Sequence, residues 1–387
     1  MILTSAILAC QILTLHQDAE FPQQRQVLPN GAVTFVEAGE PNGIFSAAIH
    51  FGSANVSAED RAAGAPHLWE HIAAKGPDKT LDMQLESAGF VLRATTDRDG
   101  TTMSIVGPKR TWQLGVSAML TLLNPVSTSQ AEIDTEAKIL KQESLLLSKS
   151  WGMESAAWGA LFGPQDADPF GQLEAMAKFT PEQMELVHQQ MTNPEAISVS
   201  VVGDIPVNVV NAMLGDTLGK LGKSPAVTPS RKPVQPPGTV RGKGRGLMWA
   251  IPVSSLASTK TFASIGLGVA FASEYPVSVN YQPSALPGFV LISSEESGVM
   301  DKLFQLDPEK FAPFVGRAQL AARAYVRGLR SNLRTYTELN ARMMRMNRAW
   351  EYDQLVAIAN QVSASDVLEA YQAMNGEEMM IVEGGLN

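Results

Sequence analysis

The sequence predicts an α+β protein built from two copies of one α/β-sandwich domain, the second of them shortened. The chain has 387 residues, enough for two or three domains. A capped helix that leads into an apolar strand occurs twice, at 179–202 and again at 362–382. Between these copies lies a stretch, 224–246, rich in Pro, Gly, Lys and Arg, which is typical of a linker.

The two helix starts carry the same capping signal. Thr180 is followed three residues later by Gln183, and Ser363 by Asp366. Such pairs satisfy backbone amides that the first turn of a helix leaves without partners. We therefore expect a signal or leader segment at 1–20, a first domain at 21–222, a linker at 223–246 and a second domain at 247–387.

Within the first domain, the apolar pattern predicts alternating strands and helices. A turn at 28–31 precedes strands at 32–37 and 45–51. Helices are predicted at 66–74 and 81–88, followed by paired strands at 90–96 and 101–106. Two amphipathic helices, at 112–123 and 129–147, complete the part before the first copy of the repeat.

The composition excludes several classes of protein. One cysteine rules out a disulfide framework and a thiolate cluster for metal. The formal net charge of -9 argues against nucleic acid as the main partner. This charge is uneven, because residues 231–350 carry 16 Lys and Arg against 7 Asp and Glu. The acidic first part and the basic later segment therefore expose different surfaces.

The first fifteen residues form an apolar run of signal-peptide length that is too short to span a bilayer. The segment that ends at Cys10 loosely resembles a lipoprotein cleavage box. We therefore expect an exported protein that is periplasmic, extracytoplasmic or lipid-anchored. The alternatives are a buried N-terminal strand or a misplaced start codon in a cytoplasmic protein. No other run approaches the length of a transmembrane helix.

The main chemical signal is the pattern His67-Leu68-Trp69-Glu70-His71. Residues four apart share one face of a helix, so both imidazoles can reach one Zn²⁺. Glu70 adjoins that face and can accept a proton from a zinc-bound water. The plainer alternative is two histidines on a solvated helix. This chain has only five histidines, and two of them fall in this pattern, which favours the metal site.

A hydrolytic zinc site needs a third protein ligand and one open position. The predicted helix at 129–147 offers carboxylates at Glu132, Glu136 and Glu143. Glu136 and Glu143 are seven residues apart and face the same way, so one can bind metal and the other can support the site. Composition alone does not rank the three, and any of them could lie on a solvated face.

These motifs, in this order, resemble those of the pitrilysin/insulinase family of zinc metallopeptidases, whose short two-domain members include the mitochondrial processing peptidases. The resemblance covers residues 28 to about 204. Its motifs are Leu28-Pro29-Asn30-Gly31, Gly52-Ser53, Gly64 to His71, Lys75-Gly76, Leu92 to Asp99, the helix with Glu136 and Glu143, Phe179-Thr180-Pro181-Glu182 and Val202-Gly203-Asp204.

The resemblance implies a role for each residue of the site. His67, His71 and Glu143 match the ligands of one zinc ion per chain, and Glu70 matches the general base. Glu136 matches an acidic residue that supports the catalytic site without binding metal. The implied activity is that of a metalloendopeptidase that hydrolyses peptides or unfolded protein segments, with Glu70 activating a zinc-bound water for attack on the scissile carbonyl.

The resemblance also implies a binding strand for substrate. Residues 92–99 match the family's edge strand, on which a peptide adds as a further strand, so Arg93, Ala94 and Thr95 are candidate substrate-binding residues. The family commonly has Asn in place of Arg93 and an aromatic residue in place of Gly100. These departures bear on substrate preference and do not touch the metal.

The second domain matches the family less well. Tyr275 resembles a tyrosine that helps to hold substrate in the family, but the usual arginine seven residues earlier is Gly268 here. Tyr275 is therefore either a substrate-binding residue or a packing residue. Four arginines, at 323, 327, 330 and 334, have helical spacing and predict one basic stripe on a helix. The stripe is a solvated face, a wall of a substrate chamber or a contact with an acidic partner.

Two functions remain open. The first is an active zinc endopeptidase, and the second is a non-catalytic partner or scaffold subunit of a heterodimeric peptidase of the same family. Members of this length form half of a four-domain clamshell that encloses the substrate, so the resemblance implies a homodimer or a heterodimer with a sister subunit. The expected partner is a peptide or an unfolded protein segment, with no role for nucleic acid and no transmembrane helix.

Overall fold

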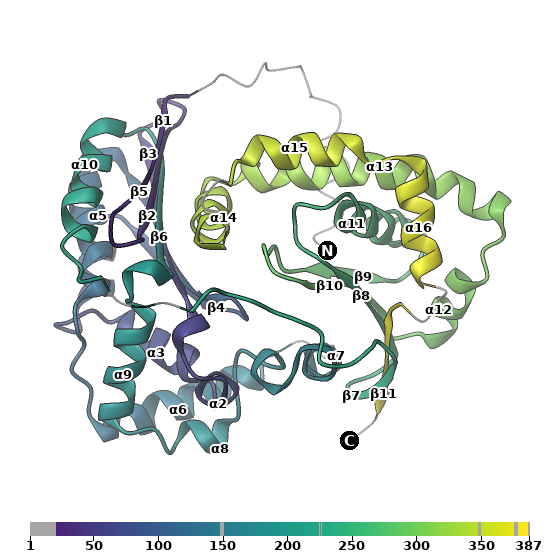
Figure 1. Ribbon diagram of the computed structural model, residues 1–387, viewed down its shortest axis with the longest axis horizontal. Coiled ribbons are helices and arrows are strands. Elements are labelled where there is room, and N and C mark those ends of the chain that lie inside the picture. Colours follow the sequence, from purple (N-terminus) through teal and green to yellow (C-terminus); the bar gives the residue numbers. More distant parts are fainter. Residues whose placement is uncertain are drawn as a thin grey trace.

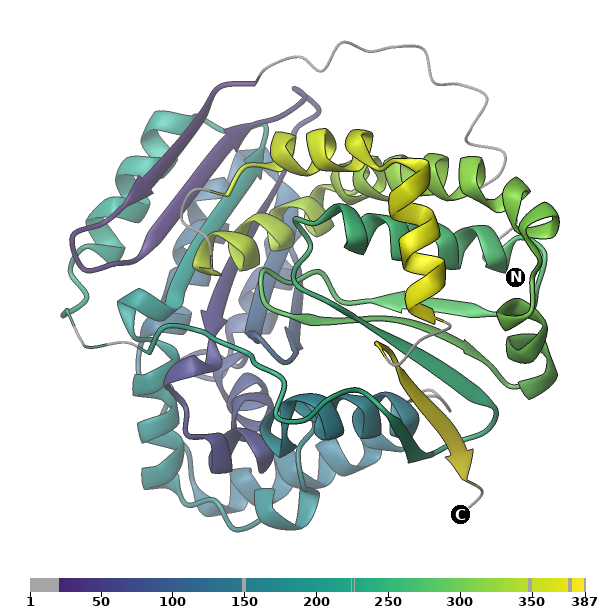
Figure 2. The same ribbon diagram turned by 45° about the vertical axis from the view of Figure 1, so that its right-hand side comes forward.

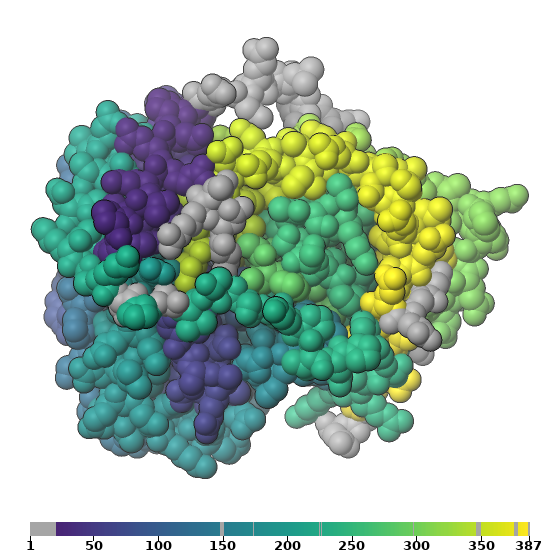
Figure 3. Space-filling view, in the orientation of Figure 1, coloured from purple at the N-terminus to yellow at the C-terminus, as the bar shows by residue number. Residues whose placement is uncertain are grey.

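The computed structural model describes residues 21–147, 151–223, 225, 227–346, 350–374 and 378–385. The predicted leader, 1–20, lies outside these residues. Two β-sheets stand side by side, each flanked by helices, and a stretch of chain that contains the linker crosses one face of the molecule between them (Figures 1 and 3). The fold is a duplicated α/β sandwich, as the sequence predicts.

The two sheets share one strand order. The first is ordered β1-β2-β6-β3-β5-β4 and the second β7-β11-β8-β10-β9. The first sheet contains β1 (Gln23–Val27), β2 (Val33–Ala38), β6 (Ile197–Gly203), β3 (Ile44–Gly52), β5 (Gly100–Pro108) and β4 (Val91–Thr96). The second contains β7 (Thr239–Lys243), β11 (Met380–Gly385), β8 (Leu247–Val253), β10 (Gly288–Ser294) and β9 (Ser278–Tyr281).

The duplication extends to strand direction. β2 pairs with β6 in parallel, and β7 pairs with β11 in parallel, whereas the other pairs are antiparallel. Within the described residues only β1 has no counterpart in the second sheet, so that sheet is one strand smaller. Residues 239–243, which the sequence assigns to the linker, form β7. The boundaries of the two domains stay a prediction.

Helices cover the faces of both sheets. Those whose apolar faces join the core of the first sheet are α3 (Ala65–Ala73), α4 (Leu81–Ser87), α5 (Trp112–Leu120), α6 (Gln130–Ser144), α9 (Pro181–Met191) and α10 (Val207–Leu218). Those that pack with the second sheet are α11 (Thr259–Ala272), α12 (Ser297–Phe304), α13 (Pro308–Ser331), α15 (Tyr352–Gln361) and α16 (Ala364–Met374). Two short helices, α2 (Ala58–Ala62) and α8 (Leu173–Met176), lie in the first half of the chain.

The two halves exchange one helix each. α7 (Trp151–Phe162) comes from the first half but packs against strands of the second sheet. α14 (Leu333–Met346) comes from the second half but packs against β3, β6 and β5 of the first sheet. Among the described residues, each is the third of five α-helices between equivalent strands, β5 and β6 in one half and β10 and β11 in the other. Figures 1 and 2 show α14 lying between the two sheets.

The local predictions agree with the structure. Each strand and helix expected in the first domain is present within a few residues of its predicted ends. Thr180 and Gln183 form the expected capping box, and Ser363 and Asp366 exchange hydrogen bonds at the start of α16. None of the helices that the structure describes is long and apolar enough to cross a membrane.

The prediction of one basic stripe on a single helix is wrong. α13 ends at Ser331, so Arg334 lies on the next helix, α14. Asn332 has an extended backbone conformation, which interrupts the helix between the two parts of the stripe. Arg330 is not simply solvated either, because its guanidinium forms an ion pair of 2.9 Å with Glu37 on β2.

Candidate metal centre

The helix α3, which carries the His67–His71 pattern, has a fixed starting point. Its N-cap residue, Gly64, has a left-handed backbone with φ of 88°. A Cβ at this position would lie 2.6 Å from the carbonyl oxygen of Phe170, so glycine is required both for the turn and for the close approach. Leu68 and Trp69 are buried in the first core, which orients the opposite face of the helix.

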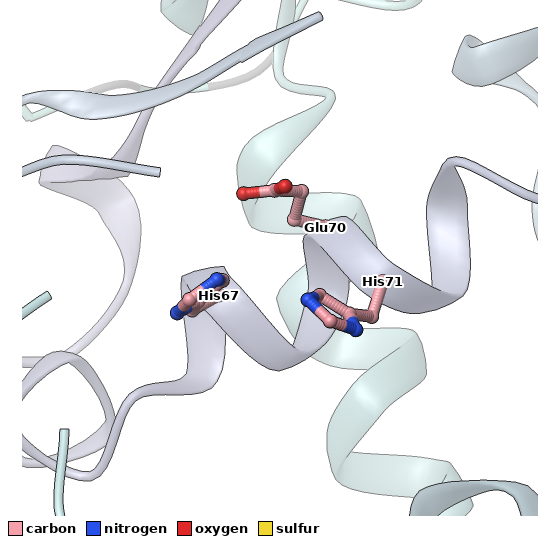
Figure 4. A group of neighbouring side chains, drawn as sticks. All are labelled: His67, Glu70 and His71. Carbon is pink, nitrogen blue, oxygen red and sulfur yellow. The ribbon is translucent and has the colours of Figure 1, made fainter. Parts of the chain in front are cut away.

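Three side chains of α3 form a compact group. The ligand atoms of His67, Glu70 and His71 all lie within 4.8 Å of one another. His67 and Glu70 are each 6% exposed, so the group is largely withdrawn from water. Figure 4 shows the two rings and the carboxylate extending from neighbouring turns of this helix. Sequence spacing alone predicted this convergence.

His71 is held by the helix α6. Its Nδ1 lies 3.1 Å from Oε2 of Glu136, whose other oxygen accepts a hydrogen bond of 2.6 Å from Lys75. A carboxylate that is paired with a lysine acts as an acceptor, so Nδ1 of His71 is the donor in this contact and Nε2 is the ring nitrogen left for another partner. Nε2 in turn lies 3.6 Å from Oε2 of Glu143, whose side chain is 42% exposed.

His67 has an unused coordinating atom. Its Nδ1 is buried and has no hydrogen-bond partner among the described residues. The ring packs edge-on against Phe170 at 4.5 Å. Burial, and secondly the charge of His71, lower the pKa of His67 to about 3. The ring is therefore neutral at pH 7, which is the form that binds a metal.

Two imidazoles and an adjacent carboxylate are a donor set that suits zinc. The orphaned nitrogen of His67 and the Glu136 support of His71 both fit this role. Glu143 is the nearest further carboxylate to His71 on α6, but its ligand atoms do not belong to the tight group of three. The residues present therefore fit a metal, with Glu143 approaching it from the exposed side.

Glu70 combines burial with one fixed oxygen. Thr96, the last residue of β4, donates a hydrogen bond of 2.6 Å to its Oε2. Burial raises the pKa of Glu70 to about 7, although the Thr96 hydrogen bond opposes that rise. A carboxyl group with such a pKa can both accept and release a proton near neutral pH.

The candidate substrate-binding residues separate into two places. Arg93, Ala94 and Thr95 lie on β4, which ends beside Glu70 and pairs with β5 alone among the described strands. Tyr275 is instead packed against the second core, with its ring 6.2 Å from that of Phe314.

The sequence did not predict a buried ion network beside the turn that follows β4. Arg231 of the linker, whose side chain is 2% exposed, lies 2.9 Å from both Asp99 and Asp166. Arg98 pairs with Glu154 of α7 at 3.0 Å, and its guanidinium lies 4.3 Å from the ring centre of Trp158. The network therefore ties the linker and α7 to the turn at the end of β4.

A second ion pair joins this turn to the second half. Arg342 of α14 lies 2.6 Å from Asp97, directly after β4. Thr96, Lys75 and Phe170 also contact the candidate site, although no role was expected for them from the sequence. Only Lys75 had a usable signal, because it follows His71 by four residues and so lies on the same face of the helix.

No protein-family model matches the sequence. Among curated proteins, the chain is 26% identical over 188 residues to the Probable zinc protease PqqL of Escherichia coli (strain K12). This match covers 45% of the chain but only 20% of that protein, so the chain spans a small part of its relative.

Solved structures match almost the whole chain, at identities that show the fold alone. A protease from Helicobacter pylori has a TM-score of 0.74 at 15% identity over 94% of this chain and 99% of its own. A peptidase M16 inactive domain from Pseudomonas fluorescens has a TM-score of 0.73 at 13% identity over 94% and 98%. The first half of the periplasmic protease PqqL from Escherichia coli has a TM-score of 0.67 at 16% identity over 94% and 92%. The resemblance to pitrilysin-type M16 peptidases is therefore confirmed.

Proposed function

From a chain that has the fold of an M16 peptidase half and resembles the pitrilysin-type zinc proteases, we propose a zinc-dependent endopeptidase that hydrolyses peptides or unfolded protein segments. The observation that carries the proposal is the compact, largely buried group of His67, Glu70 and His71 at the end of β4, whose outer edge pairs with no other described strand. A hydrolytic metal site and a strand for peptide binding are thus adjacent.

His67, His71 and Glu143 are the proposed ligands of one Zn²⁺. Glu136 holds His71 through Nδ1 and so keeps Nε2 available. A bound zinc ion would supply a Lewis acid that polarises the scissile carbonyl. Water is largely excluded on the side of His67 and Glu70, whereas Glu143 lies on the open side, from which substrate can enter.

Glu70 is the proposed general base and acid. Thr96 fixes Oε2, and we assign proton transfer to Oε1. The carboxylate takes a proton from the attacking water and returns it to the leaving amine. A pKa of about 7 suits both proton transfers, because neither the protonated nor the deprotonated form of Glu70 is strongly disfavoured at neutral pH.

The edge strand β4 is the proposed binding strand for the substrate. A peptide added beside Arg93, Ala94 and Thr95 would be held by main-chain hydrogen bonds, which gives affinity with little demand on sequence. Thr96 lies at the end of this strand and contacts Glu70, so a bound peptide would pass the catalytic carboxylate.

The decisive experiment compares Glu70→Gln with the wild-type protein. Zinc content should be unchanged and cleavage of unfolded casein or short fluorogenic peptides should be abolished. His67→Ala should lose zinc as well as activity. The proposal fails if Glu70→Gln cleaves at the wild-type rate, or if the purified wild-type protein binds no zinc.

A second candidate function is a non-catalytic subunit of a heterodimeric peptidase. Two observations favour it: Gly268 replaces the arginine expected in the second domain, and one structure of the same fold is a peptidase M16 inactive domain. This alternative would be supported if the purified chain binds no zinc and increases the activity of a sister subunit.

We also propose a homodimer or a heterodimer with a sister subunit as the assembled form. The fold matches the first half of a longer protease, which suggests that a second half is needed to enclose a substrate. The same similarity to a periplasmic protease, together with the apolar first residues, supports export from the cytoplasm. Light scattering of the active protein and fractionation of cells would test these two points.

A further inference from the structure

The edge strand β4 has two distinct faces. Leu92 and Ala94 pack against the first core, on the side of α3. Side chains alternate along a strand, so Arg93 points to the opposite face, where α14 lies. Its Nη1 is 3.9 Å from Oε2 of Glu338 on that helix, and its side chain is 52% exposed. A peptide strand added to β4 would therefore present alternate side chains to α14.

A second arginine reaches the same place from α14. Nη2 of Arg334 donates a hydrogen bond of 2.7 Å to the backbone carbonyl of Val91, the first residue of β4. Burial lowers the pKa of Arg334, and although Glu338 opposes this shift, Arg93 adds to it. Two guanidinium groups thus lie at the first residues of β4, Arg93 on the strand itself and Arg334 reaching it from α14.

One carboxylate is shared by these two cations. Glu338 also accepts a hydrogen bond of 2.6 Å from Ser104, which holds it beside β5. Its distance of 3.9 Å from Arg93 is at the limit of an ion pair. The start of β4 therefore carries an excess positive charge on the face that a bound peptide would share.

We propose that Arg93 and Arg334 form a subsite for an acidic side chain, Asp or Glu, of the peptide that adds to β4. This inference rests on the proposed function, since it deepens the recognition of that substrate. The family resemblance does not supply it, because the family commonly has Asn at the position of Arg93 and the second arginine comes from α14.

Strand geometry gives the position of the acidic residue. Directly opposed residues on neighbouring strands have Cβ atoms about 5 Å apart and side chains on the same face. Arg93 precedes Thr96 by three residues, which corresponds to about 10 Å along the strand. The preferred acidic residue is thus about three residues from the part of the peptide that lies beside Glu70.

The test uses matched fluorogenic peptides that carry a single Glu, Gln or Lys, moved stepwise along one neutral sequence. At one position, about three residues from the cleaved bond, kcat/KM should be about fivefold higher for Glu than for Gln, as expected for a cross-strand ion pair. Arg93→Glu should reverse the preference, so that the Lys peptide is cleaved faster. Equal rates for the three peptides at every position would overturn the inference.

Two further variants separate charge from structural disruption. Glu338→Gln keeps an acceptor for Ser104 but removes the competing charge, so the preference for Glu should increase. Arg241→Gln removes an equivalent charge from β7 in the second sheet, where the side chain is 84% exposed, and should leave the preference unchanged. A preference that stays the same in both Arg93→Glu and Glu338→Gln would also contradict the subsite.

A measurement of peptide binding without cleavage distinguishes failure of the subsite from failure of the proposed function. Labelled peptides are titrated into the Glu70→Gln protein, and their fluorescence anisotropy gives Kd without cleavage. If the wild-type protein cleaves no peptide but the Glu peptide binds more tightly in an Arg93-dependent manner, the subsite stands and the catalytic proposal fails. If cleavage occurs and neither Kd nor kcat/KM depends on the acidic residue, only the subsite fails.

Discussion

Nδ1 of His71 lies 3.1 Å from Oε2 of Glu136, and this contact decides which nitrogen of the ring remains available. Glu136 is nearly fully buried and is held on its other side by Lys75. The two contacts explain why the acidic residue nearer the start of α6 supports the site, whereas Glu143, seven residues later, faces Nε2. Composition and helix spacing alone did not rank these carboxylates, whereas the family resemblance implied these two roles.

Replacement of Glu136 by Gln should weaken zinc binding by about 10- to 100-fold, because His71 loses its charged orienting partner. Competition with a chelator of known affinity would measure the change. Glu132→Gln is the matched control, since Glu132 lies on the same helix and pairs with Lys79 away from the metal group. Equal loss of zinc in both variants would point to a general effect on α6 and not to His71.

Thr96→Val should lower kcat/KM by about fivefold, as expected for one lost hydrogen bond of about 1 kcal/mol to the catalytic carboxylate. Zinc content should not change, because the hydroxyl of Thr96 is hydrogen-bonded to Glu70 and Thr101, neither of which is a proposed zinc ligand. Thr96→Ser retains the hydroxyl and should restore most of the activity. An inactive Ser variant would mean that the methyl group, and not the hydrogen bond, is what the site requires.

Arg231→Met should destabilise the fold by about 3–5 kcal/mol, because it leaves Asp99 and Asp166 without their buried cation. The midpoint of urea unfolding would report this loss. Arg241→Gln, at an exposed pair, should shift the midpoint by far less. If the two variants were equally stable, the buried network would contribute nothing beyond a surface ion pair.

The stability of the fold should fall as the pH drops from about 6.5 towards 3, and His50 is one cause. Burial lowers the pKa of His50 to about 3, so in this range the unfolded chain binds a proton that the folded chain excludes. His50→Asn, which can still contact Thr102, should reduce the slope of unfolding free energy against pH by about 1.4 kcal/mol per unit. Burial also lowers the pKa values of His67 and His188, so these residues contribute to the slope equally in the wild-type protein and in His50→Asn. An unchanged slope would contradict a neutral, buried His50.

Local features of the sequence predicted the strands and helices of the first half and the proximity of His67, Glu70 and His71. The spacing of His67 and His71 depends only on helix periodicity, and the caps at Thr180 and Ser363 each depend on one residue three positions later. These signals act within one or two turns of chain, so they remain visible without any tertiary information.

Contacts between distant parts of the chain had no such signal. Arg231 and Asp99 are 132 residues apart, and nothing near either residue indicates the other. The exchange of α7 and α14 was hidden for the same reason, since an amphipathic helix reveals that it has an apolar face but not which sheet covers it. The basic stripe failed because its spacing continued across a helix boundary.

The exchange of helices has a consequence for synthesis of the chain. When the ribosome has completed only the first sheet, the apolar face of α7, with Trp158, Leu161 and Phe162, has nothing to cover it. The face of the first sheet that awaits α14 is more tolerant of water, because it includes Ser104 and Ser198, which later bond to α14. The half that carries His67, Glu70 and His71 therefore completes its packing only after the last strands of the second sheet have been synthesised. A shorter protein made of this half alone would need other residues to cover the apolar face of α7.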